Sequence, residues 1–427
     1  MSEPVGWREN MASAFSYPTI NRFFTFALWS TPPLLGSVAS FVWHGGALWC
    51  VKEIAAGRKS FATTRAFRIT SILLLFYGLM LVVSFLANSP SLETAPRLLP
   101  AATPLLFPFS YSIWAICDRD RIAHAISIAS CIACLGAFSL AIVEFFVWQT
   151  RPEGGAGNSL VFAVVTGAAA CACLGSLVTL HRRYNRVVNA IIAFAATCGF
   201  GAVVLSESRS LWVACLLAIL GLVLPYVRLL PRIPLKFTIG AIALLAALGT
   251  LSIEPVSQRF GALAENFHAL EVDENYDTSL GLRVALFDIG MQKVAGAPLL
   301  GSGIQNTRDI IAAEMWAQYE LDRGFTHFHN GFLTAAVEAG TFGATALLLL
   351  LLFVGIAGMK TLWVHGEGPR ALGGAILVSM FCIYALGGSF NMILGQDLYD
   401  TMFMIMLISG CILAFPEPKS VPDASKS

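Results

Sequence analysis

Residues 326–356 read THFHNGFLTAAVEAGTFGATALLLLLLFVGI. This stretch begins with His327 and His329 and becomes apolar from Asn330, for long enough to cross a bilayer, which takes roughly 20 helical residues. The preceding residues, 254–328, form the one long stretch of the chain that is polar enough to lie in water. The sequence therefore predicts a large aqueous loop that ends at a membrane surface, with the two histidines at its end.

The composition of the chain excludes an ordinary soluble protein. Hydrophobic residues make up 56% of its 427 residues and charged residues 12%, with a mean hydropathy of +0.72. Soluble proteins carry about twice this charged fraction. Transmembrane barrels show weakly alternating segments of about 10 residues, which the long apolar runs do not resemble. The prediction is an all-α polytopic membrane protein, and a net charge of +1 argues against nucleic acid as a partner.

The number of membrane helices depends on the N-terminal apolar stretch, residues 23–51. Two adjacent prolines, Pro32 and Pro33, disfavour an uninterrupted helix, so about twelve transmembrane helices are expected. Read as one span, the stretch would give about eleven and an outward N-terminus. The other predicted spans are 68–87, 98–117, 122–148, 158–180, 187–206, 210–228, 236–253, 330–356, 371–391 and 397–415.

The connections between spans alternate in basic content. Lysine and arginine gather in one set (52–68, 119–121, 182–186, 228–236 and 360–370) and are few in the other (88–97, 149–157, 206–210, 254–328 and 391–397). By the positive-inside rule, the basic set is cytoplasmic. The expected organisation is an N-terminal membrane part, 1–253, a large periplasmic loop with short helices, 254–328, a C-terminal membrane part, 329–415, and a disordered cytoplasmic tail, 416–427.

The ten cysteines all lie within apolar runs, so no disulfide is expected to staple the large loop. Cys131/Cys134 and Cys171/Cys173 have spacings seen in metal sites, but thiolates in lipid without an adjacent histidine are improbable metal ligands. We interpret these residues as small apolar packing groups. No cleaved signal peptide is indicated at the N-terminus.

Two arginines of the outer connections are candidate functional residues. Arg209 lies in a tight turn between two spans, where a charge usually has a partner or a polar cavity. The alternative is an interfacial arginine that lies beside Trp212. Arg283 begins a predicted amphipathic helix, and a solvated position is the alternative there. The apolar side of this helix is predicted to contain Leu280, Val284, Phe287, Met291 and Val294 and to lie either on the membrane or on the top of the bundle.

A second short helix in the loop is predicted from Asn306 or Thr307 to Tyr319. Arg308 and Asp309 in its first turn are expected to form a surface ion pair. In the following membrane helix, Glu338 comes nine positions after His329, which would place it on the opposite side of that helix.

The two histidines at the end of the loop are the candidates for acid–base chemistry. His329 fits a general base, because imidazole titrates near neutral pH. Capping of the next helix by Asn330 and His329 is the structural alternative. No cysteine or H-E-x-x-H pattern accompanies the histidines, so a metal is not expected.

These elements together resemble a known family. His329-Asn330, followed after nine residues by Gly340 and after two more by Gly343, is similar to the signature of the bacterial O-antigen ligase and polysaccharide polymerase superfamily. The 298–303 turn, the helix of Arg283 and the Ser208-Arg209-x-x-Trp212 element occur in the family's order. The resemblance covers roughly residues 190–345 in its motifs.

This resemblance implies a GT-C-like, lipid-linked glycosyltransferase in the bacterial inner membrane. Family members transfer a glycan from undecaprenyl diphosphate at the periplasmic face, ligases to the lipid A–core of lipopolysaccharide and polymerases to a lipid-linked repeat unit. By resemblance, Arg209 and Arg283 would hold the diphosphate and His329 would be the base. His327, Asn330 and Arg308 are candidate substrate-binding residues, and no metal or other cofactor is implied.

Two other classes of function are alternatives to an enzyme. A transporter would be expected to show related halves and polar residues near the bilayer midplane, whereas the polar residues here gather at one surface. A scaffold for an assembly complex would tolerate loss of the arginines and of His329. The predicted clustering favours the enzyme.

Overall fold

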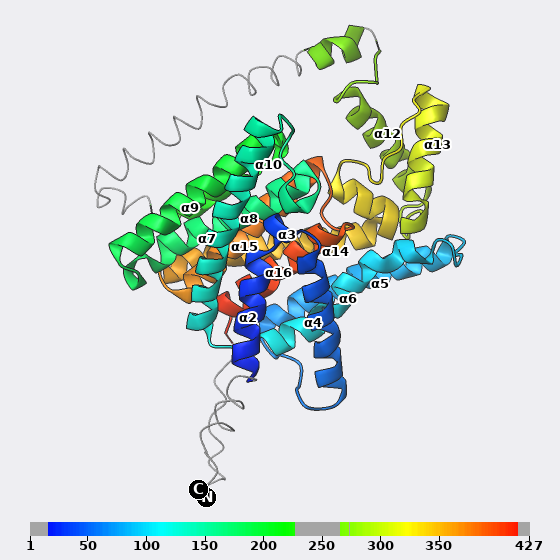
Figure 1. Ribbon diagram of the computed structural model, residues 1–427. Coiled ribbons are helices and arrows are strands. Elements are labelled where there is room, and N and C mark those ends of the chain that lie inside the picture. Colours follow the sequence, from blue (N-terminus) through cyan, green and yellow to red (C-terminus); the bar gives the residue numbers. More distant parts are fainter. Residues whose placement is uncertain (1–15, 227–264, 273, 417–427) are drawn as a thin grey trace, which may run out of the picture.

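The computed structural model describes residues 16–226, 265–272 and 274–416 of the chain. All regular elements in these ranges are helices, which confirms the all-α prediction, and Figure 1 shows α12 and α13 together at one end of the molecule. The α-helices are α2 (Tyr17–Ser30), α3 (Pro32–Leu35), α4 (Val38–Ala55), α5 (Arg65–Ala87), α6 (Ala102–Trp114), α7 (Arg119–Ile142), α8 (Ser159–Leu180), α9 (Arg186–Leu205), α10 (Arg209–Val223), α12 (Gly281–Gly296), α13 (Thr307–Tyr319), α14 (Gly331–His365), α15 (Pro369–Phe381) and α16 (Asp397–Ala414).

Within these ranges, 8 helices are long and apolar enough to cross a membrane. The outer surface of α5 shows how such a helix meets lipid. Five of its large apolar side chains are exposed and recur every three or four positions, so they form one stripe along the helix: Ile72, Phe76, Leu79, Val83 and Leu86. A continuous apolar stripe of this length suits a hydrocarbon environment rather than water.

The centre of the bundle is formed by α15 and α16, whose membrane-spanning windows are 89% and 94% buried. Pairs of glycines let these helices approach their neighbours closely, as is common in membranes. A Cβ atom at Gly374 would lie 2.8 Å from the Gly358 carbonyl oxygen of α14, and one at Gly373 would lie 2.7 Å from the Gly410 carbonyl oxygen of α16. The connection between α15 and α16 therefore emerges at the centre of the bundle.

The N-terminal apolar stretch is interrupted at the two prolines, as predicted. Helix α2 ends at Ser30, the short α3 follows, and α4 begins at Val38. At the open end of this hairpin, the Tyr17 hydroxyl donates to Glu53 Oε2 at 2.6 Å. Helices α2, α4 and α6 are not among the 8, and the predicted span 236–253 lies outside the described residues. The total of about twelve helices thus stays a prediction.

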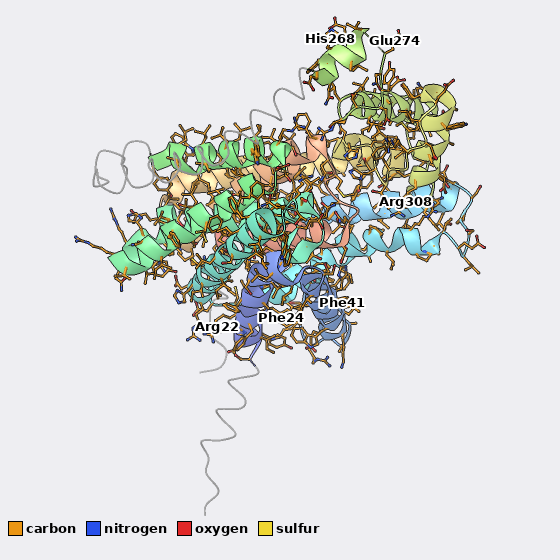
Figure 2. The ribbon with its side chains drawn as sticks, turned by 45° about the horizontal axis from the view of Figure 1, so that its top comes forward. Arg22, Phe24, Phe41, His268, Glu274 and Arg308 are labelled. Carbon is orange, nitrogen blue, oxygen red and sulfur yellow. The ribbon has the colours of Figure 1, made fainter. Side chains whose placement is uncertain are left out.

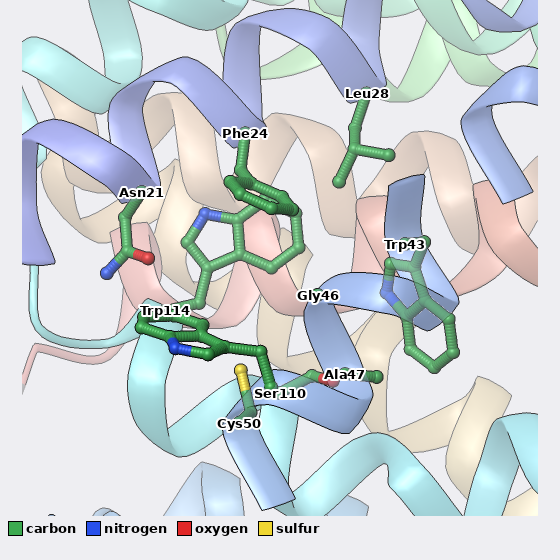
Figure 3. Close-up of a pocket in the computed structure, with 10 residues that line it drawn as sticks. Asn21, Phe24, Leu28, Trp43, Gly46, Ala47, Cys50, Ser110 and Trp114 are labelled. Carbon is green, nitrogen blue, oxygen red and sulfur yellow. The ribbon is translucent and has the colours of Figure 1, made fainter. Parts of the chain in front are cut away.

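The hairpin packs tightly against α6, as Figure 3 shows. A Cβ atom at Gly46 would lie 2.7 Å from the Phe24 ring, so glycine makes room for that ring. Asn21 donates to the Ile113 carbonyl at 2.8 Å, and Trp114 Nε1 donates to Thr25 at 2.8 Å. The small, mostly apolar cavity left between these helices measures about 30 Å³ and has no Asp, Glu, His, Lys or Arg in its lining.

The described connections of the two predicted sets lie at opposite ends of the bundle. At one end, Arg183 pairs with Asp120 and Arg182 pairs with Glu367 at 3.3 Å, which joins three basic connections. At the other end, Arg151 donates to the Ser206 carbonyl at 2.7 Å, which joins two of the connections poor in basic residues. The sequence therefore assigned these loops to the correct relative sides. The predicted tail falls largely on residues 417–427, outside the described residues.

Helices α12 and α13 pack on the first turns of α14 through a separate apolar cluster. It contains Leu286, Ile289, Ile311, Met315 and Phe328. The predicted bounds of α13 are confirmed, with Asn306 as the N-cap residue.

The apolar residues that the sequence groups on α12 do not rest on the bundle. Val284, Phe287 and Met291 are exposed, which leaves the membrane as the alternative for this side, whereas Leu286 and Ile289 are buried. The small Gly290 lies on the packed face, because a Cβ atom there would lie 2.6 Å from the Leu333 side chain.

A kink in α14 fixes the 298–303 turn. Gly340 has φ 71° and ψ 173°, a conformation that is essentially restricted to glycine. Its non-helical backbone lets Thr341 N donate to the Pro298 carbonyl at 2.9 Å, and Ser302 N donates to the Val337 carbonyl at 2.6 Å. A Cβ atom at Gly340 would overlap the Leu299 carbonyl. This glycine thus docks the loop onto the membrane helix.

We expect Gly340→Ala to destabilise the protein by at least about 1–3 kcal/mol, the usual cost of such backbone strain, with the steric overlap added. The measurement is the midpoint of thermal unfolding of the detergent-solubilised protein. Gly45→Ala in α4 is the matched control, because a Cβ atom there meets nothing within 4 Å. Equal midpoints for the two variants would contradict the docking role of Gly340.

Candidate active site

A cavity of about 800 Å³ opens where the connections poor in basic residues meet. Six parts of the chain line it: 96–100, 151–161, 304–308, 326–329, Glu338 and 391–399. Three of the predicted site residues belong to this wall, namely His327, His329 and Arg308. The fold thus brings segments that are distant in sequence together around one polar cavity.

The backbone at His329 directs its side chain toward the cavity, and the side chain does not cap α14. His329 has φ 49°, a left-handed conformation in which histidine is one of the tolerated residues. The N-cap of α14 is Asn330, whose Oδ1 accepts from Phe332 N and Leu333 N, both at 3.1 Å. Capping therefore involves Asn330 alone, and the imidazole of His329 remains on the cavity wall.

The environment of His329 favours its neutral form. Burial lowers its pKa, the neighbouring His327 lowers it further, and the positive charge of Arg283 contributes as well, to a value of about 4. A neutral imidazole can accept a proton at neutral pH, which is what a general base requires. Its ring contacts Phe325 edge-on at 5.4 Å between centroids and His327 at 4.5 Å.

His327 is held at both ring nitrogens. Nδ1 lies 3.0 Å from the Thr326 hydroxyl, and Nε2 lies 3.1 Å from Asn391 Oδ1. Because an amide oxygen can only accept, Nε2 carries the proton and Nδ1 accepts from Thr326. Burial lowers the pKa of His327, so this ring is neutral at neutral pH.

Neither of the two predicted arginines, Arg209 and Arg283, belongs to the cavity wall. The side chain of Arg283 is exposed, but protein packed around it partly desolvates its guanidinium and lowers its pKa, and the charge of Arg209 lowers it further. Arg283 in turn acts on His329. Arg283 is thus electrostatically coupled to both His329 and Arg209. Arg209 is the first residue of α10, next to the buried Ser208.

The expected ion pair between Arg308 and Asp309 is wrong. Asp309 pairs instead with Arg97 at 2.9 Å, and Arg97 also donates to the Gln305 carbonyl. Arg308 is exposed on the cavity wall, and Figure 2 shows it between the α12–α13 part and the α5–α6 hairpin. The charge of Arg308 is thus directed to the cavity region rather than neutralised by its neighbour in sequence.

The predicted position of Glu338 is also wrong. It was expected across the helix from His329, yet both residues line the same cavity. The half-turn count assumed one continuous helix, whereas His329 precedes the helix in a left-handed conformation. Glu338 is buried and accepts a hydrogen bond from the Thr307 hydroxyl at 3.2 Å.

Sequence reasoning missed three wall residues: Arg97, Arg151 and Asn391. Arg151 donates through Nε to the Ser206 carbonyl at 2.7 Å and through a terminal nitrogen to Ser208 Oγ at 3.1 Å. Arg97 and Arg151 lie in outer connections that are otherwise poor in basic residues. An isolated arginine in such a connection was the signal in the sequence that could have marked them as site residues. Asn391 carried no such mark.

No group of three or more potential metal ligands (His, Cys, Asp or Glu) is found among the described residues. The ten cysteines are free, and Cys131, Cys134 and Cys173 pack together in the bundle with sulfur–sulfur distances of 3.8 and 4.0 Å to Cys173. Metal independence itself stays a prediction.

The fold and the site define a polytopic α-helical membrane protein with a cavity at one end of its bundle that three arginines, two glutamates and two histidines line. Residues 193–348, from α9 into α14, match the family model described as O-antigen ligase. This match confirms the resemblance to the O-antigen ligase and polymerase superfamily and supports an enzyme of that general type. A comparison with curated proteins gives no match.

Proposed function

We propose that the protein is an O-antigen ligase-type glycosyltransferase of the bacterial inner membrane. It transfers a glycan from undecaprenyl diphosphate to a sugar hydroxyl of the lipid A–core of lipopolysaccharide, at the periplasmic face and without a metal. The alternative within the same family is an O-antigen or exopolysaccharide polymerase, whose acceptor is a second lipid-linked repeat unit. The two alternatives share one active site and differ in the acceptor.

The observation that carries this proposal is the position of His329, whose pKa is lowered by burial, by His327 and by Arg283, on the wall of a cavity of about 800 Å³ that three arginines also line. Acceptor activation needs a neutral base, and departure of a diphosphate needs positive charge close by. Both requirements meet at one end of the bundle, on the side that the positive-inside rule assigns to the periplasm.

In the proposed reaction, the acceptor hydroxyl attacks the anomeric carbon of the donor sugar while His329 takes the hydroxyl proton. The new C–O bond forms as the bond to the diphosphate oxygen breaks, and undecaprenyl diphosphate leaves with the electron pair. Arg209 and Arg283 bind its phosphate oxygens, because guanidinium groups match phosphate bidentately and stay charged. His327 and Arg308 contact substrate from the cavity wall. Asn330, occupied as a cap, places the base. A single displacement inverts the anomeric centre.

The test is glycan transfer by the purified protein from an undecaprenyl-diphosphate-linked glycan. Lipid A–core and a second lipid-linked repeat unit are offered separately as acceptors, each with and without a chelator. Transfer to lipid A–core supports the ligase, and transfer to the repeat unit supports the polymerase. No transfer to either acceptor contradicts the enzyme, and loss of transfer in chelator contradicts the metal-free mechanism.

The pH dependence of transfer follows from the lowered pKa of His329. A base must be unprotonated, so activity is retained above the pKa and lost as the pH falls through it. We expect the acidic limb of kcat/KM, which reports the free enzyme, near pH 4 rather than near the value of about 6.5 of an exposed histidine. The measurement is kcat/KM from about pH 3.5 to 8. A limb at the ordinary histidine value would show that burial and Arg283 do not depress the base.

A further inference from the structure

We propose that Asn391 is a positioning residue, which acts through His327 to hold the imidazole of His329 toward the acceptor. This inference rests on the proposed function of His329 as the base. It concerns a residue in the connection between α15 and α16, which follows the 3₁₀ turn Gly388–Phe390.

Among the described residues, the imidazole of His329 has no hydrogen-bonding partner. No described residue donates to or accepts from either of its ring nitrogens, so its nitrogens are available to substrate. Its orientation is set by the left-handed backbone and by the rings of Phe325 and His327. A base whose ring is placed by packing alone depends on the rigidity of the groups around it.

Asn391 holds the ring of His327 in place. Nε2 of His327 donates to Asn391 Oδ1 at 3.1 Å, and Asn391 is only 2% exposed. The other end of the amide, Nδ2, donates to the Tyr399 hydroxyl at 2.6 Å. Tyr384 donates to the Tyr399 carbonyl at 2.9 Å. The His327 ring is thereby anchored to the central helices, not merely to its own loop.

The charge of the surrounding groups affects His329 as a base. The titratable and charged groups around His329 come from several elements: His327 from its own loop, Arg283 from α12, Arg308 from α13, Glu338 from α14, and Arg97, Arg151 and Glu153 from the other connections. A neutral His327 keeps a further positive charge away from His329 when that base accepts a proton. The hydrogen bond from Nε2 to an uncharged amide serves this purpose better than one to a carboxylate, which would favour a charged ring.

Removal of the amide should therefore affect chemistry more than binding. We expect Asn391→Leu to lower kcat about 10–100-fold with little change in KM, as is usual when an orienting partner is lost. The freed His329 ring becomes better hydrated, so the acidic limb of kcat/KM should move to higher pH. Ser389→Ala is the matched control, because Ser389 lies in the same connection and its hydroxyl bonds only the Ala385 carbonyl.

A double-mutant cycle tests the route through His327. If Asn391 acts through that ring, the Asn391→Leu/His327→Gln double variant should be no slower than the slower single variant. Multiplicative losses, or an unmoved acidic limb, would overturn the inference even if His329 proves essential. Should Asn391→Leu fail to fold, Asn391→Asp provides the test: it keeps an oxygen toward His327, and its charge should lower transfer at acidic pH by charging that ring. Full activity of a His329 variant would instead refute the proposed function itself.

Discussion

Replacement of His329 by asparagine is expected to lower the rate of glycan transfer by about 10²–10⁴, the usual contribution of a general base. Asparagine tolerates the left-handed backbone at φ 49°, so the variant removes the imidazole without straining the chain. Substrate binding should change little, because the base acts on the proton of the acceptor hydroxyl. The measurement is kcat and KM for transfer from the lipid-diphosphate donor.

His365→Asn is the control for this prediction. His365 is the last residue of α14, exposed and at the opposite end of the same helix. Its replacement should leave transfer within about twofold of the unchanged protein, as for most surface substitutions. Unchanged transfer by the His329 variant would remove the imidazole from the mechanism and leave a binding or scaffolding protein as the remaining explanation.

The parts of the fold that were predicted from sequence are those with local causes. Pro32 and Pro33 interrupt a helix wherever they occur, and Asn330 caps the start of α14 through its side-chain oxygen. Hydropathy and basic content assigned the connections to opposite ends of the bundle, because lipid and membrane insertion act on each segment separately. Such features need no knowledge of the neighbours in space.

The features that were missed or wrong depend on contacts between distant segments. The partner of Arg97 is Asp309, 212 positions away, and Asn391 lies 64 positions from His327. Neither distance can be inferred from spacing in the sequence. The packed face of α12 could not be predicted for a similar reason, because Gly290 matters only once Leu333 of α14 lies against it.

The histidine loop shows the same limit within a short distance. The count that placed Glu338 opposite His329 presumed helical backbone from one to the other. The left-handed residue before the Asn330 cap turns the imidazole toward the cavity instead. The backbone conformation of one residue therefore decides which side chains line the site. This is why the motif residues could be identified from the sequence but their relative orientation could not.

Replacement of Arg283 by alanine is expected to lower kcat by about 10²–10³, on the order of 3 kcal/mol for one donor at a site of developing charge. Negative charge grows on the diphosphate as its bond to the sugar breaks, so the loss should fall mainly on kcat. Arg283→Lys should recover part of the rate, because it keeps the charge and loses the bidentate fork. Arg323→Ala is the control: Arg323 is an exposed arginine of the same outer region, paired with Asp277 at 3.0 Å, and such surface pairs contribute only about 0–1 kcal/mol.

A second readout separates a phosphate ligand from a merely structural arginine. The positive charge of Arg283 helps to lower the pKa of His329, so Arg283→Ala should move the acidic limb of kcat/KM to higher pH, whereas Arg283→Lys should leave it close to its original position. A structural arginine would change protein yield and thermal stability without this difference between the two variants. If alanine and lysine both transfer at the normal rate, the diphosphate is bound elsewhere, and Arg308 on the cavity wall becomes the residue to replace next.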